Sequence, residues 1–218
     1  MSKKYVVSDL HANDPRFDHE AFELFRKEIV KDDSIIFVGD IFDQYVARSA
    51  DTPPIRKDKD IYIRGNHDRG IENLGFDLVD NYEQNGIFFI HGNQFDEKKN
   101  YGWHLRWLLL FVILFYKLTG IDLQSRLRLW NIKLGKLFNK NEFFSYISII
   151  HDRARVCKNE KNYKFLIMGH THQCMMDDDI CDLGCWYKNK ERTYYYATVD
   201  ENDIALCSLT YVEDDSIQ

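Results

Sequence analysis

Phe165-Leu166-Ile167-Met168-Gly169-His170-Thr171-His172 is an apolar run that ends in two histidines. An apolar run of this length, followed at once by glycine, is typical of a buried strand that ends in a turn. Two imidazoles at a strand end can both face one point, and neutral imidazole is the commonest side-chain ligand for metals. Alone, the pair is weak evidence, because chance spacing or two core histidines would explain it equally well.

Four other apolar runs in the chain end in the same way, with Asp, His or Asn directly after the run. They are Val6-Val7, before Ser8-Asp9-Leu10-His11; Ile35–Val38, before Gly39-Asp40-Ile41-Phe42-Asp43; Ile61–Ile63, before Arg64-Gly65-Asn66-His67-Asp68; and Ile87–Ile90, before His91-Gly92. Five strands that each deliver such side chains at the carboxyl edge predict one shared site.

Length and composition favour one ordered globular domain over the 218 residues, with room for an insertion. Hydrophobic residues make up 44%, with only 11 Gly and 3 Pro. The net charge of −6 lacks the basic excess of a non-specific nucleic-acid binder. The charge is uneven, however. Residues 98–140 hold nine Lys or Arg against one acid, so this segment carries +8 and the remainder −14.

The sequence predicts a cytoplasmic protein without a transmembrane segment. The first strand begins within a few residues of Met1, which leaves no room for a signal peptide. The longest apolar run, Trp107–Tyr116, has ten residues, whereas a bilayer requires about 20. The five cysteines form no CxxC pair, which favours reduced thiols over a disulfide framework.

The remaining patterns predict an α/β (α+β) fold. A helix capped by Asp18 is expected to reach about Lys31, and 83–86 is expected to be the turn of a hairpin between strands in 76–82 and 87–90. Three helices are expected over 103–118, 122–138 and up to about 156, and late strands over 193–199 and 204–209. We therefore expect a single domain, a β-sandwich flanked by helices in four layers, with a helical cap inserted at about 100–158.

The order of the five polar blocks resembles that of the calcineurin-like metallophosphoesterases. The resemblance implies two divalent metal ions that clamp a phosphate and activate water. Asp40 would bridge the two ions, because one carboxylate offers two oxygens. Asp9, His11 and His172 would complete one metal site, and Asn66, His91 and His170 the other. This mixed oxygen and nitrogen set suits Mn best, with Fe, Zn or Mg as alternatives.

His67 is expected not to bind metal. The resemblance implies that Asp68 orients His67, which would donate a proton to the leaving oxygen, whereas a structural turn histidine is the alternative. Asp43 is expected to support the site or cap a helix rather than to bind metal. Arg64 and Arg69 flank this block and could contact phosphate, although two solvated surface arginines would explain them equally well.

The segment between His91 and His170 resembles the lipid-handling cap of the UDP-diacylglucosamine pyrophosphohydrolases. This resemblance implies a lipid-linked or UDP-sugar-type substrate, and peripheral contact with an anionic membrane at its inner face. The alternative is that Trp107–Tyr116 packs as core. Those enzymes carry Arg where this chain has His67, so the block Gly65–Asp68 is closer to the general phosphoesterase pattern.

Two other functions stay open. The first is a general phosphomonoesterase or phosphodiesterase that acts on phosphoproteins or nucleotides. The second is a non-catalytic scaffold, as in the retromer subunit of the same fold, but a scaffold is free to lose ligand residues and every expected position is filled here. Nucleic acid is not expected as a substrate, because the chain is acidic outside 98–140.

Overall fold

The computed structural model describes residues 3–43, 58–96, 140–200 and 203–212. The chain divides into two compact units, residues 1–93 with 153–218, and residues 94–152. The predicted helices over 103–118 and 122–138 lie outside the described residues, so the helical cap stays a prediction. Helix α4 (Lys140–Glu160) covers the third predicted helix.

The first sheet has six strands in the order β11-β10-β1-β2-β3-β4. Strands β1 to β4 run parallel to one another, and β10 and β11 join antiparallel beside β1. Their bounds are Lys4–Val7 for β1, Ser34–Val38 for β2, Ile61–Ile63 for β3, Leu78–Val79 for β4, Thr193–Val199 for β10 and Ile204–Thr210 for β11.

The second sheet has five strands in the order β5-β6-β7-β9-β8. Strands β6, β7 and β9 are parallel, with an antiparallel strand at each edge. Their bounds are Tyr82–Gln84 for β5, Ile87–Phe89 for β6, Phe165–Met168 for β7, Cys174–Met176 for β8 and Ile180–Leu183 for β9.

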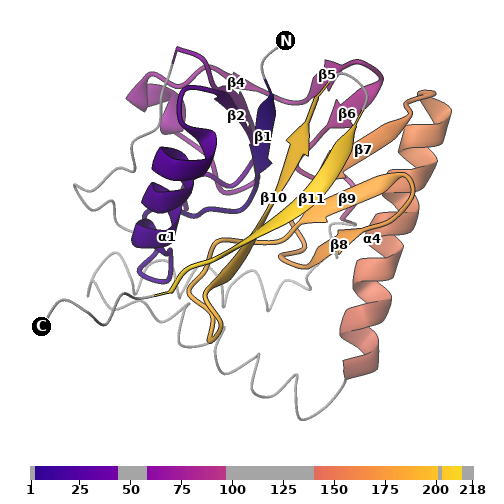
Figure 1. The fold of residues 1–218 in the computed structure, drawn as a ribbon. Helices are drawn as coiled ribbons and strands as arrows, with labels where there is room; N and C mark the ends of the chain where they lie inside the picture. The colour runs from indigo at the N-terminus through magenta and orange to yellow at the C-terminus, as the bar shows by residue number, and fades with distance from the viewer. Residues whose placement is uncertain (1–2, 44–57, 97–139, 201–202, 213–218) are drawn as a thin grey trace, which may run out of the picture. The chain divides into compact units, whose positions relative to one another are not determined.

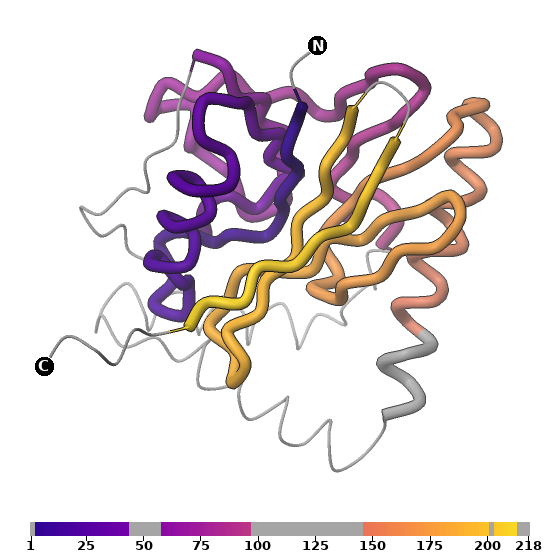
Figure 2. Tube along the Cα trace, viewed as in Figure 1, coloured from indigo at the N-terminus to yellow at the C-terminus, as the bar shows by residue number. Residues whose placement is uncertain are grey.

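The two sheets pack face to face. Val6 and Ile36 of the first sheet share one buried cluster with Phe89, Ile167 and Leu183 of the second. Side chains alternate along a strand, so the remaining side chains of the first sheet point to its other face. These side chains are also apolar, and they form a separate core. In Figure 1, β1 and β2 of the first sheet lie to the left of β7, β8 and β9 of the second, and Figure 2 traces the same view along the backbone.

Helix α1 (His19–Leu24) continues into a π-helical segment, η1 (Phe25–Val30), and together they cover the outer face of the first sheet. Asp18 caps α1 by accepting a hydrogen bond from the backbone N–H of Ala21 at 3.2 Å. A short 3-10 helix, η2 (Ile71–Leu74), follows the β3 loop. Within the described part of the chain, no helix has the length and apolar character needed to cross a membrane.

Most predicted elements within the described residues are confirmed, one prediction needs correction, and one pair of strands was missed. The predicted hairpin turn holds left-handed backbone at Asn85 and Gly86, as a tight two-residue turn requires. Its first strand, however, is β5, because Leu78 and Val79 leave the hairpin to pair with β3 in the other sheet. The pair β8–β9 was not predicted as two strands, since the acidic turn 177–179 separates two short runs without clear alternation.

Candidate metal centre

The structure gathers six of the predicted site residues around one point. Their potential ligand atoms lie within 4.8 Å of one another in three overlapping groups: Asp9, His11 and His172; His11, Asp40 and His67; and Asp9, Asp40 and His91. These residues follow the carboxyl ends of β1, β2, β3, β6 and β7, so strands of both sheets contribute.

Asp40 lies at the centre of this cluster. Its Oδ1 accepts a hydrogen bond from the backbone N–H of His67 at 2.8 Å. Its Oδ2 lies 3.3 Å from Nε2 of His91 and 3.8 Å from Nε2 of His11. One oxygen of Asp40 therefore faces one histidine from each of the two predicted metal sites, and its bridging role stays a prediction.

Asp9 lies between two histidines of the β7 loop. Its Oδ2 accepts the backbone N–H of His170 at 2.9 Å and the hydroxyl of Ser8. Its Oδ1 lies 3.1 Å from Nε2 of His172, and that nitrogen lies 3.4 Å from Nε2 of His11. Asp9, His11 and His172 thus place oxygen and nitrogen atoms together, in the combination predicted for one metal ion.

His91 is oriented by a backbone carbonyl. Its Nδ1 donates to the carbonyl of Val38 at 2.8 Å, which leaves Nε2 to face Asp40. Such a hydrogen bond fixes the tautomer that a metal-binding imidazole needs. The ring of His170 lies 5.3 Å from that of His91, centroid to centroid. Asn66 lies in the adjoining β3 loop, next to His67. Its contact with a metal ion stays a prediction.

Five of the seven predicted ligand positions hold left-handed backbone. The φ angles are 52° at Asp9, 47° at His11, 51° at Asp40, 74° at His170 and 60° at His172. Residues other than glycine seldom adopt this conformation, and such backbone clusters at functional sites. Hydrogen bonds between neighbouring loops hold it here: His11 N–H donates to Asp40 O at 2.9 Å, and Asp9 N–H to Gly39 O at 3.1 Å.

Two glycines let these loops approach each other. A Cβ on Gly65 would lie 2.1 Å from Oδ1 of Asp40, and one on Gly169 would lie 1.8 Å from Oγ of Ser8. Any side chain at either position would push a carboxylate out of the cluster, because Ser8 bonds Asp9. These two glycines therefore permit the close approach of the loops.

Buried polar atoms without hydrogen bonds indicate that the cluster fits a divalent cation. Within the described residues, Asp9 Oδ1 and His91 Nε2 face the cluster and are buried without a hydrogen bond of normal geometry. Buried polar atoms are nearly always paired, so such atoms together indicate a missing ligand. Carboxylate oxygens mixed with imidazole nitrogens suit Mn, Fe or Zn. Solvent reaches the cluster at His67 and His172, which are 14% and 24% exposed.

The pKa values in the cluster reflect its negative charge. Burial alone would lower the pKa of His91 and of His172, but Asp40 and Asp9 respectively outweigh it and raise each pKa to about 10. Burial of His11 prevails over the attraction of Asp40 and lowers its pKa to about 4. Asp40 has a pKa below its usual range, because His91 opposes the effect of burial. The carboxylates therefore attract positive charge into a buried space.

His67 faces Asp43 and not Asp68, which corrects the predicted pairing. Its Nδ1 lies 3.2 Å from Oδ1 of Asp43. Asp68 is fully buried, and its carboxylate accepts backbone N–H groups from Ile41, Phe42 and Gly65 at 2.8, 3.1 and 2.8 Å. Adjacency in sequence misled the prediction, because neighbouring side chains in this loop point to different partners. Asp68 ties the β2 loop to the β3 loop.

Asp43 is itself held by a residue that sequence reasoning missed. The side chain of Asn13 donates to Asp43 O at 2.8 Å and accepts from Asp43 N–H at 2.6 Å. This two-point contact fixes the backbone that carries the Asp43 carboxylate toward His67. The only signal in the sequence was its position two residues after His11.

The two arginines predicted near phosphate have other surroundings in this structure. Arg64 is 40% exposed; it forms an ion pair with Glu72 and lies 3.4 Å from Asp80. Arg69 is exposed. No contact of either with the cluster is observed in the part of the chain that the structure describes, and a phosphate contact stays a prediction.

Sequence reasoning also missed an aromatic residue beside the cluster. The ring of Tyr187 stacks on His11, with centroids 5.3 Å apart and planes at 30°, and lies 5.6 Å from the ring of His172. Tyr187 follows β9 and pairs with Phe17 in an isolated β-bridge. No motif in the sequence connects it with the β1 loop.

Comparison with known proteins gives a family match. The family model described as calcineurin-like phosphoesterase matches residues 3–174. The matched span contains all five polar blocks and both sheets as far as the start of β8. No curated protein matches the chain.

Several solved structures resemble the fold at low sequence identity. A predicted phosphoesterase from Streptococcus pneumoniae is 16% identical, with a TM-score of 0.43 over 96% of this chain and 89% of the other. An archaeal phosphodiesterase is 15% identical, with a TM-score of 0.42 over 95% and 99%. Vacuolar protein sorting 29 from Cryptosporidium parvum is 11% identical, with a TM-score of 0.41 over 96% and 98%.

Proposed function

The chain belongs to the calcineurin-like phosphoesterase family, and from this premise we propose that it is a dinuclear metal-dependent phosphoesterase. It hydrolyses a phosphate ester or a pyrophosphate bond. The observation that carries the proposal is the position of Asp40, whose Oδ2 faces His11 on one side and His91 on the other.

The proposed centre uses two sets of ligands that share Asp40. Asp9, His11 and His172 would hold one ion, and Asn66, His91 and His170 the other, with Mn as the favoured metal. When bound, two divalent cations neutralise the charge of the phosphate and lower the pKa of a water molecule. The buried carboxylates of Asp9 and Asp40 would supply the negative charge that holds both cations.

His67 acts from the solvent-exposed side of the cluster. Its Nδ1 faces Asp43, which stabilises the protonated ring and orients its other nitrogen. A protonated His67 can donate to the leaving oxygen as the ester bond breaks, which contributes roughly 10²–10⁴-fold to rate. Asn13 keeps Asp43 in position for this pairing.

Activity against a panel of substrates in Mn²⁺ tests the proposal. The panel contains an aryl phosphate, an aryl phosphodiester, a nucleoside diphosphate sugar and its acylated form. Hydrolysis of at least one, lost on chelation and restored by Mn²⁺, supports a metal-dependent phosphoesterase. A folded protein that binds Mn²⁺ and hydrolyses none of them would favour the scaffold function instead.

A lipid-linked substrate is a second candidate, favoured by the +8 charge of 98–140 and the apolar run Trp107–Tyr116. If this segment holds acyl chains, replacing Leu110 and Ile113 with Glu weakens binding of the acylated substrate and leaves aryl phosphate hydrolysis nearly unchanged. Equal loss of both activities, or unfolding, would place these residues in a core and remove the support for a lipid.

A further inference from the structure

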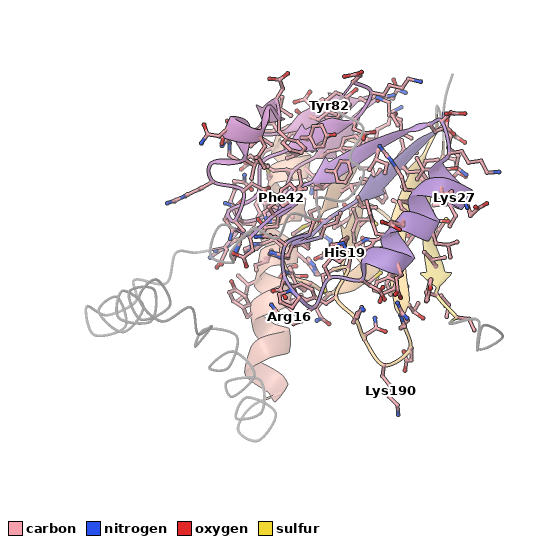
Figure 3. The ribbon with its side chains drawn as sticks, turned by 90° about the vertical axis from the view of Figure 1, so that its left-hand side faces the viewer. Arg16, His19, Lys27, Phe42, Tyr82 and Lys190 are labelled. Atoms are coloured by element: carbon pink, nitrogen blue, oxygen red, sulfur yellow. The ribbon has the colours of Figure 1, made fainter. Side chains whose placement is uncertain are left out.

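A half-exposed arginine lies beside the metal cluster without belonging to it. Arg16 is 32% exposed, and its guanidinium carbon lies 4.2 Å from the centre of the Tyr187 ring. That ring in turn stacks on His11. In Figure 3, Arg16 lies well apart from Tyr82, whose hydroxyl accepts from Lys4 at the start of β1. Arg16 is therefore on the side where β1 ends and the cluster begins.

The guanidinium is held firmly relative to His11. Arg16 Nε donates to Oδ1 of Asp14 at 2.9 Å, and Nη2 donates to Oδ2 of the same carboxylate. Asp14 is only 2% exposed, and its backbone N–H donates to the carbonyl of His11 at 2.7 Å. Nη2 also lies 3.4 Å from the hydroxyl of Tyr187. These contacts connect Arg16 to the loop that carries His11. They therefore fix the position of the guanidinium relative to the cluster.

One side of the guanidinium is left for a ligand. Asp14 occupies Nε and Nη2, and Nη1 makes no hydrogen bond within the described residues. An arginine fork readily binds phosphate oxygens through such a free edge. Arg16 has no contact with Asp9, Asp40 or the cluster histidines in the described chain, since the Tyr187 ring stands beside both it and His11. Arg16 is therefore separated from His11 by the Tyr187 ring, which places it beside the cluster and not among its candidate ligands.

We infer that Arg16, supported by Tyr187, binds a second anionic group of the substrate, such as the neighbouring phosphate of a diphosphate. The inference rests on the proposed phosphoesterase function and adds a substrate class to it. Arg16 is a specificity residue, which favours phosphate esters with two adjacent negative groups over those with one.

Two nucleotide substrates that differ in the number of charged phosphates test this inference. UDP-glucose has two charged phosphates, and thymidine 5′-(p-nitrophenyl phosphate) has one. For Arg16→Met, we expect kcat/KM with UDP-glucose to fall about 10- to 100-fold, mainly through KM, as for loss of a charge-assisted hydrogen bond. With the singly charged diester we expect a change of less than about three-fold, and Arg16→Lys should lie between Met and wild type for UDP-glucose.

Lys190→Met is the matched control, because it removes an exposed cation from the loop in which Lys188 N–H donates to Arg16 O at 2.7 Å. This variant should leave kcat/KM unchanged with both substrates. An unchanged ratio of the two kcat/KM values in folded Arg16→Met, or equal loss for both, would overturn the inference. If Arg16→Met does not fold, the ratio measured with Arg16→Lys decides in the same way.

Binding of uridine diphosphate, measured by calorimetry in Mn²⁺, separates this inference from the proposed function. Wild type should bind it at least ten-fold more tightly than Arg16→Met, whether or not any substrate is turned over. Equal affinities would contradict the role of Arg16. Absence of hydrolysis with this affinity difference intact would contradict the phosphoesterase proposal alone.

Discussion

Left-handed backbone at Asp9, His11, Asp40, His170 and His172 sets the geometry of the cluster. This conformation costs an L residue roughly 1–2 kcal/mol, so it persists only where neighbouring structure enforces it. The enforcing contacts are short hydrogen bonds between adjacent loops, including those from His67 N–H to Asp40 and from His170 N–H to Asp9. The carboxylates that face the cluster are thus also the groups that fix the loops of the histidines.

The pairing of His67 with Asp43 predicts a kinetic effect without loss of metal. His67→Ala should lower kcat about 100-fold or more, because proton donation to the leaving group is lost, while metal content stays at the wild-type value. Asp43→Asn should give a similar decrease, and the double variant should be little worse than either single variant. Steady-state kinetics with metal analysis measures both quantities.

His19→Ala is the matched control, since His19 is the first residue of α1 and its ring packs on Phe17. Its kcat should equal that of wild type. Loss of bound metal in His67→Ala, in parallel with activity, would make His67 a ligand or a folding residue instead of a proton donor.

At the scale of elements, the sequence predicted where the strands end. It did not predict which side chains of the following loops contact one another. β2 and β7 begin and end within a residue of the predicted bounds, because buried strands are apolar runs with a turn signal after them. The partner of His67 was predicted wrongly, since the contact with Asp43 joins loops of different strands. Tyr187 and Arg16 were missed for the same reason. Their proximity to His11 arises from tertiary packing, which leaves no local pattern.

Helix α1 depends on one buried carboxylate. Asp18 is fully buried; it caps α1 and accepts from Arg192 Nε at 2.8 Å and Nη2 at 2.6 Å. Asp18→Ala should lower the free energy of unfolding by about 2–4 kcal/mol, because the cap is lost and Arg192 loses its buried partner. Glu20→Ala, which removes the exposed second partner of Arg192, should cost less than about 1 kcal/mol. Urea unfolding at pH 7 measures both.

The Asp18 contribution should also depend on pH. Burial would raise its pKa, but hydrogen bonds from Arg192 and Tyr194 prevail and lower it below the usual 3.8. A depressed pKa in the folded state means that the stabilisation is complete above about pH 4 and is lost as the pH falls through the folded value. The difference between wild type and Asp18→Ala should therefore shrink in acid. A difference that grows in acid would contradict this account.

At the scale of the whole molecule, the two sheets meet at a cluster of negative charge that a cation would stabilise. Removal of metal by a chelator should lower the melting temperature, and excess Mn²⁺ should restore it, because ligands that bind only the folded state stabilise it by mass action. At a hundred times the dissociation constant this gain is about 2.7 kcal/mol. A melting temperature that is indifferent to chelator and to Mn²⁺ would argue against a site preformed in the fold.

The most direct test of the central claim is the number of Mn²⁺ ions bound per chain, measured on wild type and Asp40→Asn together with aryl phosphate hydrolysis. We predict a value close to two for wild type and loss of both metal and turnover in Asp40→Asn, because this carboxylate faces both halves of the cluster. An Asp40→Asn protein that keeps full turnover, or a wild type that is active with no bound metal, would contradict the dinuclear centre.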